Sequence, residues 1–256
     1  MLIRSLFSAF LMYSRIPVPQ VEWKEENRRY ALCFFPLIGA VIGVFFMLWT
    51  YAAEKLEIGP VFKGAVFMLI SMAVTGGIHF DGFCDVSDAV SSWGDKQKRL
   101  EIMKDSHVGA FAVISLAVCL IAQTAVYSEI SGYGTAVVIS AGCILSRALS
   151  GICAVCFKCA KNDGALQSFV KPSHKKISQI SLAVTALAAV ALMIIFGGIT
   201  GLAAAAAAFA VLVYYRVTAY RRFGGITGDT EGWFLVMCEV FLSAAAVLAE
   251  KITEVF

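Results

Sequence analysis

Charged residues are scarce in this sequence. Only 15% of its 256 residues are Asp, Glu, Lys or Arg, whereas 59% are hydrophobic, and the mean hydropathy is +0.79. Soluble globular chains carry roughly a quarter charged residues, so this composition excludes a soluble protein and predicts a polytopic membrane protein. The sequence also lacks an arginine-rich segment and a nucleic-acid-binding motif, and we therefore expect no nucleic acid among its partners.

A complete zinc-binding motif is missing as well. Cys153, Cys156 and Cys159 follow a C-x-x-C-x-x-C spacing, but the second pair of ligands that such a zinc site needs is absent. Most of the eight cysteines lie inside apolar runs or at their ends, where cysteine behaves as a small hydrophobic residue. We therefore expect the cysteines to have structural roles.

The hydrophobic residues are grouped in long runs. A helix needs about 20 apolar residues to cross the hydrocarbon core of a bilayer. A shorter run near the N-terminus, between Arg4 and Arg15, predicts an amphipathic or re-entrant helix. The predicted fold class is all-α, a polytopic membrane helix bundle of about seven transmembrane helices plus this N-terminal helix. The expected spans are residues 31–53, 59–80, 108–128, 132–157, 177–196, 199–217 and 233–250.

Basic residues are divided unevenly between the two sides of the predicted bundle. All but four of the 21 Lys and Arg residues fall in the N-terminal segment or in connections on its side. Lys55, Lys63 and Lys251 lie on the other side, and Arg147 lies inside a span. Because basic residues stay on the cytoplasmic side, we expect a cytoplasmic N-terminus. A buried Arg147 should be compensated by a carboxylate or by a bound phosphate, and a purely structural ion pair remains open.

The densest group of polar residues lies between residues 79 and 107, on the predicted cytoplasmic side. Asp81, Asp85 and Asp88 are spaced i, i+4 and i+7, so in a helix their carboxylates lie on one face. Like charges this close repel one another unless a cation lies between them, and oxygen-only ligands favour Mg²⁺ or Mn²⁺. A solvated loop remains the alternative. Nearby bases suited to phosphate oxygens are Lys96, Lys98, Arg99 and Lys104.

A second acidic segment, residues 220–232, falls on the same predicted side. It contains glycines that allow sharp turns and offer backbone N–H groups to an anion. Thr227 and Asp229 lie beside these glycines. We therefore expect the two acidic segments to meet at one membrane face.

Carboxylates, bases and a glycine-rich loop together favour an enzyme that transfers a phosphoryl-linked group. The D-G-x-x-D sequence at residues 81–85 resembles the start of the aspartate motif of the CDP-alcohol phosphatidyltransferases. The Ala-Arg pair that follows in that family is absent, because Asp85 and Val86 stand there. A CDP-alcohol phosphotransferase of lipid synthesis stays an alternative. A secondary transporter is less favoured, because the acids gather at one face and no internal repeat is visible.

A longer series of motifs resembles the cobalamin synthase family, the adenosylcobinamide-GDP ribazoletransferases. The matching segments are FLMYSRIPVP, RRYALCFFPLIGAVIG, GGIHFDGFCDVSDA, RLEIMKDSHVGAF, SRALSG and RRFGGITGDTEGWF, in the family's order. The sequence departs from the family's usual pattern at residues 159–169, where an Arg-Pro pair more often precedes the glycine. This departure leaves the role of Lys161 undefined.

The resemblance implies a single integral-membrane transferase domain over residues 1–256, in a bacterial or archaeal plasma membrane, with a cytoplasmic active site. The implied reaction is the Mg²⁺-dependent transfer of the adenosylcobinamide-phosphate group from adenosylcobinamide-GDP to α-ribazole or its 5′-phosphate. We expect the 5′ oxygen of ribazole to attack and GMP to leave, giving adenosylcobalamin or its 5′-phosphate. The oligomeric state is left open, a homo-oligomer included.

Matched position by position, the resemblance also assigns roles to single residues. The implied metal ligands are Asp81, Asp85 and Asp88. The implied catalytic residues, which supply further ligands or orient the attacking hydroxyl, are Asp88, Asp105 and Asp229. The implied substrate-binding residues are His79, Lys104, Ser106, Arg147 and Thr227.

Overall fold

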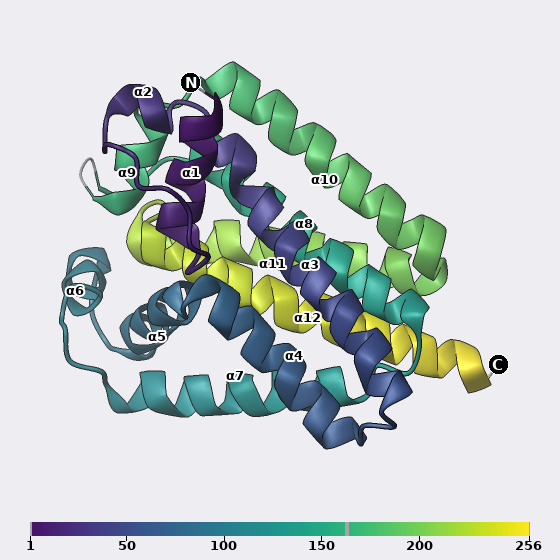
Figure 1. Ribbon diagram of the computed structural model, residues 1–256. Coiled ribbons are helices and arrows are strands. Elements are labelled where there is room, and N and C mark those ends of the chain that lie inside the picture. The colour runs from purple at the N-terminus through teal and green to yellow at the C-terminus, as the bar shows by residue number, and fades with distance from the viewer. Residues whose placement is uncertain (1, 162–163, 256) are drawn as a thin grey trace.

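The computed structural model describes residues 2–161 and 164–255. In these residues the chain is almost entirely helical, with one isolated parallel β-bridge between Cys159 and Ile226. The elements labelled in Figure 1 are α1 (Leu2–Tyr13), α2 (Glu25–Arg28), α3 (Ala31–Lys55), α4 (Pro60–Thr75), α5 (Ile78–Ser91), α6 (Lys96–Ile102), α7 (Ala110–Ser128), α8 (Tyr133–Cys156), α9 (Ala165–Val170), α10 (Lys175–Gly197), α11 (Ile199–Thr218) and α12 (Gly228–Val255), and a short π-helix, η1 (Ala219–Phe223), continues α11.

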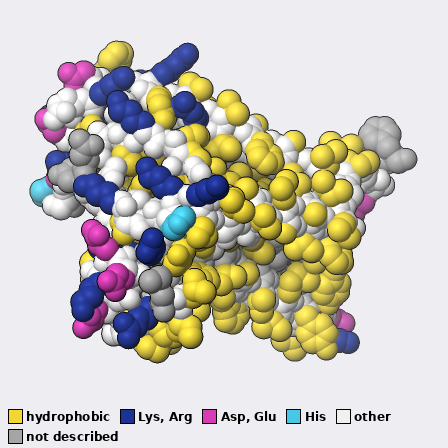
Figure 2. All heavy atoms as spheres, turned by 90° about the horizontal axis from the view of Figure 1, so that it is seen from above, with side chains coloured by type: hydrophobic (Ala, Val, Ile, Leu, Met, Phe, Trp, Pro, Cys, Tyr) yellow, Lys and Arg dark blue, Asp and Glu magenta, His cyan; other side chains and the backbone are white. Residues whose placement is uncertain are grey.

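Six helical segments are long and apolar enough to cross a membrane: α3, α7, α8, α10, α12, and α11 together with η1. The α4–α5 pair is also apolar enough but bends by 96°, so the described residues contain six or seven spans by length and composition. This confirms the predicted all-α multi-pass bundle. Figure 2 shows a surface covered largely by hydrophobic side chains, with charged side chains gathered at one end, which we call the charged end.

The second predicted span, residues 59–80, is too long at its C-terminal end. Helix α4 stops at Thr75, because Gly76 and Gly77 take left-handed conformations with φ of 65° and 77°. Glycine adopts such angles without steric cost. The chain restarts as α5 at Ile78 in a new direction, which places the aspartate-rich helix at the charged end in Figure 1.

Helices α8 and α12 organise the core. Helix α8 packs against α3, α10, α11 and α12, and it is the most deeply buried of the spans. Its backbone lies so close to α3 that a Cβ atom on Gly39 would collide with the carbonyl group of Cys143. Helix α12 packs against α8 and α11 and also against α5. It therefore connects the core to the aspartate-rich helix.

Candidate functional site

The aspartate-rich helix α5 packs against the start of α12. Its helical form from Ile78 to Ser91 confirms that Asp81, Asp85 and Asp88 share one face. A Cβ atom on Gly82 would lie 2.7 Å from the carbonyl oxygen of Asp229, and one on Gly232 would lie 3.0 Å from the carbonyl oxygen of His79. Glycine at both positions therefore lets the two helix backbones touch, which brings Asp229 beside α5.

Negative charge is concentrated where α5 meets α12. Helix α5 bends away from α4 by 96° and lies at the charged end. Burial, together with the carboxylates of Asp229, Asp81 and Asp88, raises the pKa of Asp85 to about 6. Neither Asp81 nor Asp85 has a side-chain hydrogen bond or ion pair with another described residue. Asp81 and Asp85 therefore carry like charges that no described residue pairs, whereas the charge of Lys161 acts on Asp229.

These carboxylates offer the ligand chemistry of a hard divalent cation but not a finished coordination site. Oxygen-only ligands favour cations such as Mg²⁺. A cation would relieve the repulsion that, after burial, contributes to the raised pKa of Asp85. As the side chains lie, no three His, Cys, Asp or Glu residues in the described part of the chain are grouped closely enough to hold a metal ion. A bound cation would require Asp81, Asp85 and Asp229 to turn towards a common point.

Asp88 has a different environment from the other acids of α5. Its Oδ2 accepts a hydrogen bond from the backbone N–H of Gly109 at 2.7 Å, and its Oδ1 accepts one from Ala112 at 2.8 Å. Asp88 therefore satisfies two N–H groups at the start of α7, which have no partner within the helix itself. Its metal-binding and catalytic roles stay predictions.

The glycine-rich segment before α12 ends in a helix cap. The N–H of Thr227 donates to Oγ1 of Thr230 at 2.8 Å, and the N–H of Thr230 donates to Oγ1 of Thr227 at 3.2 Å. The N–H of Ile226 also donates to the carbonyl oxygen of Lys158 at 2.9 Å, which ties this segment to the end of α8. These bonds fix the position of Asp229 one residue inside the helix, where the charges of Lys161 and Asp81 act on it.

Three other predicted site residues lie in the connection between α6 and α7. Lys104, Asp105 and Ser106 are exposed. Asp105 accepts a hydrogen bond from the N–H of His107 at 3.0 Å and lies 2.7 Å from its Nδ1 atom, and these contacts hold the pKa of Asp105 below its usual range. The described structure engages Asp105 within its own loop and does not bring these residues into contact with Asp81.

Arg147 is buried in the bundle and paired with a carboxylate that the sequence reasoning missed. Its Nη1 atom lies 2.6 Å from Oε1 of Glu239 on α12 and donates to the carbonyl oxygen of Cys143 at 2.9 Å. The hydroxyl of Ser146 also donates to Glu239 at 3.0 Å. An acid inside the predicted span 233–250 is itself a signal, because carboxylates in a membrane need a partner. The acids therefore do not all gather at one face.

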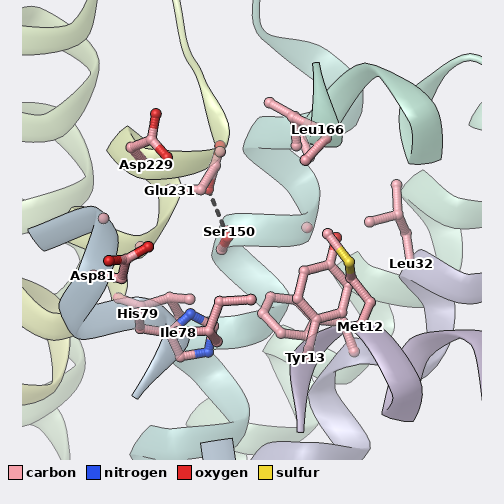
Figure 3. A pocket seen from close by; sticks show the side chains of 18 residues that line it. Met12, Tyr13, Leu32, Ile78, His79, Asp81, Ser150, Leu166, Asp229 and Glu231 are labelled. Atoms are coloured by element: carbon pink, nitrogen blue, oxygen red, sulfur yellow. Dashed lines mark hydrogen bonds between the residues drawn. The ribbon is translucent and has the colours of Figure 1, made fainter. Parts of the chain in front are cut away.

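An enclosed cavity of about 250 Å³ opens beside the acidic group. Figure 3 shows Asp81 and Asp229 at one end of it and Met12, Tyr13 and Leu32 at the other. The lining comes from α1, α3, α5, α8 and α12, together with Ala165 and Leu166 of α9. The cavity therefore joins a mainly apolar interior to the carboxylates.

Two polar residues of this cavity wall, Ser150 and Glu231, were missed from the sequence, and a third, His79, was predicted to bind substrate. Oε2 of Glu231 accepts a hydrogen bond from the hydroxyl of Ser150 at 2.5 Å, and Oε1 accepts one from the hydroxyl of Tyr215 at 2.9 Å. His79 is 8% exposed, and its Nε2 atom is buried without a hydrogen-bond partner among the described residues. Burial, with a smaller contribution from Arg147, lowers the pKa of His79 to about 3, so the imidazole is neutral near pH 7.

A second, more open cleft of about 650 Å³ shares part of its lining with the enclosed cavity. Met12, Ile78 and Asp81 belong to the lining of both spaces. The cleft also contains Arg15, whose side chain lies against Gly76. Two binding volumes of different size therefore meet at the carboxylate of Asp81.

Comparison with known proteins gives a consistent result. A family model described as cobalamin-5-phosphate synthase matches residues 5–247. An adenosylcobinamide-GDP ribazoletransferase of Lachnoclostridium phytofermentans is 40% identical over 250 residues, which cover 98% of this chain and 95% of the relative. Proteins of the same name from Clostridium botulinum (strain Alaska E43 / Type E3) and Geobacillus sp. (strain WCH70) are 32% and 31% identical, each over 93% of this chain and 95% of the relative. No solved structure matches.

Proposed function

The chain belongs to the cobalamin-5-phosphate synthase family, transferases of the final stage of cobalamin biosynthesis, and from this premise we propose its reaction. The adenosylcobinamide-phosphate group is transferred from adenosylcobinamide-GDP to α-ribazole or α-ribazole 5′-phosphate, and GMP is released. The name shared by the relatives, adenosylcobinamide-GDP ribazoletransferase, supports this donor and this acceptor.

The observation that best supports this reaction is the place of Asp81 between two cavities. A two-substrate transfer needs two binding volumes that meet at the reacting atoms. The enclosed cavity of about 250 Å³ and the open cleft of about 650 Å³ share Asp81, and Asp229 lines the enclosed cavity next to it. The open cleft suits the larger corrinoid donor, and the enclosed cavity suits a smaller acceptor.

We propose a different attacking oxygen from the one expected from the sequence. The family description, cobalamin-5-phosphate synthase, supports a product with a phosphate at the 5′ position of the acceptor, and a 5′ oxygen that carries a phosphate is not available to form the new bond. We therefore propose a secondary hydroxyl of the ribose as the attacking group. That oxygen bonds to the phosphorus attached to the cobinamide arm, and the bond from this phosphorus to the oxygen of GMP breaks, without a covalent enzyme intermediate.

We propose that Asp229 is the general base that accepts the proton of the attacking hydroxyl. This carboxylate lines the enclosed cavity and is fixed by the backbone contact between Gly82 and α12. General bases must lie within hydrogen-bond reach of the proton that they accept. Lys104, Ser106, Arg147 and Thr227 stay predictions as substrate-binding residues.

We further propose Mg²⁺ as the cofactor, held by Asp81, Asp85 and one carboxylate oxygen of Asp229, which leaves the other oxygen of Asp229 to accept the proton. The support is the close approach of these carboxylates: burial, and then the charges of Asp229, Asp81 and Asp88, raise the pKa of Asp85 to about 6. When bound, Mg²⁺ neutralises charge on the diphosphate and on the leaving phosphate. Without it, these carboxylates repel an anionic donor.

We propose that the charged end faces the cytoplasm of a bacterial or archaeal cell. The basic side chains at this end, visible in Figure 2, follow the positive-inside rule. The donor carries a guanine nucleotide, which is a cytoplasmic type of substrate. This orientation places the acidic group and both cavities where the donor is made.

Turnover by the purified full chain tests the proposal. With adenosylcobinamide-GDP, α-ribazole and Mg²⁺, the protein in detergent should form adenosylcobalamin and GMP, detected by chromatography and mass spectrometry. Comparing kcat/KM for α-ribazole and its 5′-phosphate identifies the preferred acceptor. CDP-activated lipid precursors should give no product. Turnover of these precursors, with none from adenosylcobinamide-GDP, would favour the CDP-alcohol phosphotransferase instead.

A further inference from the structure

The interior of the enclosed cavity is apolar and aromatic. Met12 and Tyr13 of α1, Leu32 and Phe35 of α3, and Leu166 of α9 all contribute to its wall. The rings of Tyr13 and Phe35 pack with their centroids 4.4 Å apart. Walls of this kind bind flat aromatic groups through dispersion and exclusion of water.

Apart from the carboxylate of Asp81, His79 contributes an unpartnered polar atom to the residues that line this cavity. The Nε2 atom of His79 is buried and makes no hydrogen bond within the described chain. The oxygens of Glu231, by contrast, already accept hydrogen bonds from Ser150 and Tyr215. A buried polar group without a hydrogen bond is unfavourable. The wall therefore favours a ligand that carries one complementary polar atom among apolar ones.

We infer that this cavity binds the aromatic base of the nucleoside acceptor, a dimethylbenzimidazole, and that Nε2 of His79 donates a hydrogen bond to its free ring nitrogen. This inference rests on the proposed function and adds a subsite to it. The glycosylated base has a single unsubstituted ring nitrogen, and the rest of its edge is apolar. With the base against Tyr13 and Phe35, the ribose lies towards Asp81 and Asp229 at the other end of the cavity in Figure 3.

The chemistry of this wall does not suit the other parts of the two substrates. Guanine has several donors and acceptors on its edge, and each would need a polar partner on burial. A corrin ring is far larger than a cavity of about 250 Å³. The guanine and the corrin therefore belong to the open cleft or to the surface beyond it.

The test fills the cavity and compares the effect on each substrate. Leu32→Trp places an indole in the space meant for the base, and Leu32 lines the enclosed cavity but not the open cleft. Leu37→Trp is the matched control, because Leu37 lies on the same helix but lines an apolar groove against α1. For Leu32→Trp we expect the KM for α-ribazole to rise about tenfold or more, equivalent to about 1.4 kcal/mol. The KM for adenosylcobinamide-GDP should stay within about twofold, and Leu37→Trp should change neither value by more than that.

A second pair of variants tests the hydrogen bond. His79→Phe removes the donor and keeps a ring, and we expect the KM for α-ribazole to rise about tenfold. His79→Gln keeps an N–H donor and should recover part of this loss. A purely structural His79 would instead lower the melting temperature in both variants and leave the two KM values unchanged.

A competition measurement needs no variant. Free 5,6-dimethylbenzimidazole should inhibit the native full chain competitively against α-ribazole and not against adenosylcobinamide-GDP. Competition against the donor, or an unchanged KM for α-ribazole in folded Leu32→Trp and His79→Phe, would overturn the inference. In that outcome, turnover by the native chain leaves the proposed function intact. Absence of turnover by the native chain would instead contradict the proposed function itself.

Discussion

The protein contains acidic residues in two different environments, one in which the carboxylate is paired and one in which the carboxylates are not. Inside the bundle, Glu239 accepts hydrogen bonds from Arg147 at 2.6 Å and from Ser146 at 3.0 Å. At the charged end, Asp81 and Asp85 lie close to Asp229, and the described residues give the side chains of this α5 pair neither a hydrogen bond nor an ion pair. One group contains a carboxylate with its counter-charge, and the other contains carboxylates that repel one another.

This difference indicates which group belongs to the fold and which to the chemistry. A compensated carboxylate stabilises helix packing, because breaking the pair would leave a buried charge. Crowded carboxylates without a cation oppose folding, and such groups are typical of sites that a ligand completes. Variants of the two groups should therefore change different properties of the protein.

The largest effect is expected for the buried pair. Glu239→Leu leaves Arg147 unpaired and should lower the free energy of unfolding by about 3–5 kcal/mol. The double variant Glu239→Leu with Arg147→Met removes both charges and should recover most of this loss. Thermal unfolding in detergent measures both changes.

The same double variant tests the predicted contact between Arg147 and the diphosphate. Turnover by the stable double variant would assign Arg147 to the fold alone. A stable double variant without turnover would support the substrate-binding role that the sequence predicts. If Glu239→Leu unfolds at the temperature of the native protein, the pair does not stabilise the bundle.

Variants of the acidic residues at the charged end should lose activity rather than stability. Asp81→Asn or Asp85→Asn should lower kcat by about a hundredfold to a thousandfold, because each removes charge at the reacting centre. The melting temperature should stay unchanged or rise, since repulsion within the group is relieved. Asp95→Asn is the control, because Asp95 caps α6 with a hydrogen bond from Lys98 and asparagine caps equally well. Near-native turnover by both variants would contradict the metal assignment.

Metal binding should stabilise the protein through the acidic group alone. At a Mg²⁺ concentration about 100 times its dissociation constant, a ligand that binds only the folded state contributes about 2.7 kcal/mol. Melting curves with Mg²⁺ and with EDTA measure this gain, and EDTA should also abolish turnover. The gain should disappear in Asp81→Asn and persist in the double variant of Glu239 and Arg147. A gain of equal size in Asp81→Asn would place the cation elsewhere.

The smallest effect is expected for Asp88. Its carboxylate accepts hydrogen bonds from other residues, as that of Glu239 does, whereas in the described part of the chain those of Asp81 and Asp85 do not. Asp88→Ala leaves the N–H groups of Gly109 and Ala112 without their acceptor and should cost about 0.5–2 kcal/mol, as loss of a helix cap does. Asp88→Asn keeps one acceptor oxygen and should lose less. Thermal melting and kcat are measured together. A fall in kcat of a hundredfold with unchanged stability would instead support the predicted catalytic or metal-binding role of Asp88.

The sequence predicted those features that depend on local pattern. Apolar runs predicted the spans, and the i, i+4, i+7 spacing predicted that Asp81, Asp85 and Asp88 share a helical face. The break at Gly76 and Gly77 was missed because hydrophobic residues continue on both sides of it. Composition measures apolarity, whereas this break depends on backbone angles.

Features that depend on long-range contacts could not be predicted in the same way. The partner of Arg147 lies on α12, 92 residues away in the sequence. The N–H groups that donate hydrogen bonds to Asp88 lie 21 and 24 residues away from it. The cavity combines side chains from helices at opposite ends of the sequence, including Tyr13 and Leu235. Spacing within a segment contains no information on which distant segment packs against it.

The contact of Gly82 and Gly232 between α5 and α12 has a consequence for ion choice. At this contact main chain meets main chain, with Gly82 against Asp229 and Gly232 against His79. The separation of the two helices therefore cannot adjust through side-chain rotation. Mg²⁺ demands a smaller and more regular oxygen shell than Ca²⁺, which accepts larger and more variable ones. If the proposed cation binds here, a fixed separation between the carboxylate-bearing backbones would favour selection by ionic radius, and two residues without a side chain would then contribute to the choice of metal.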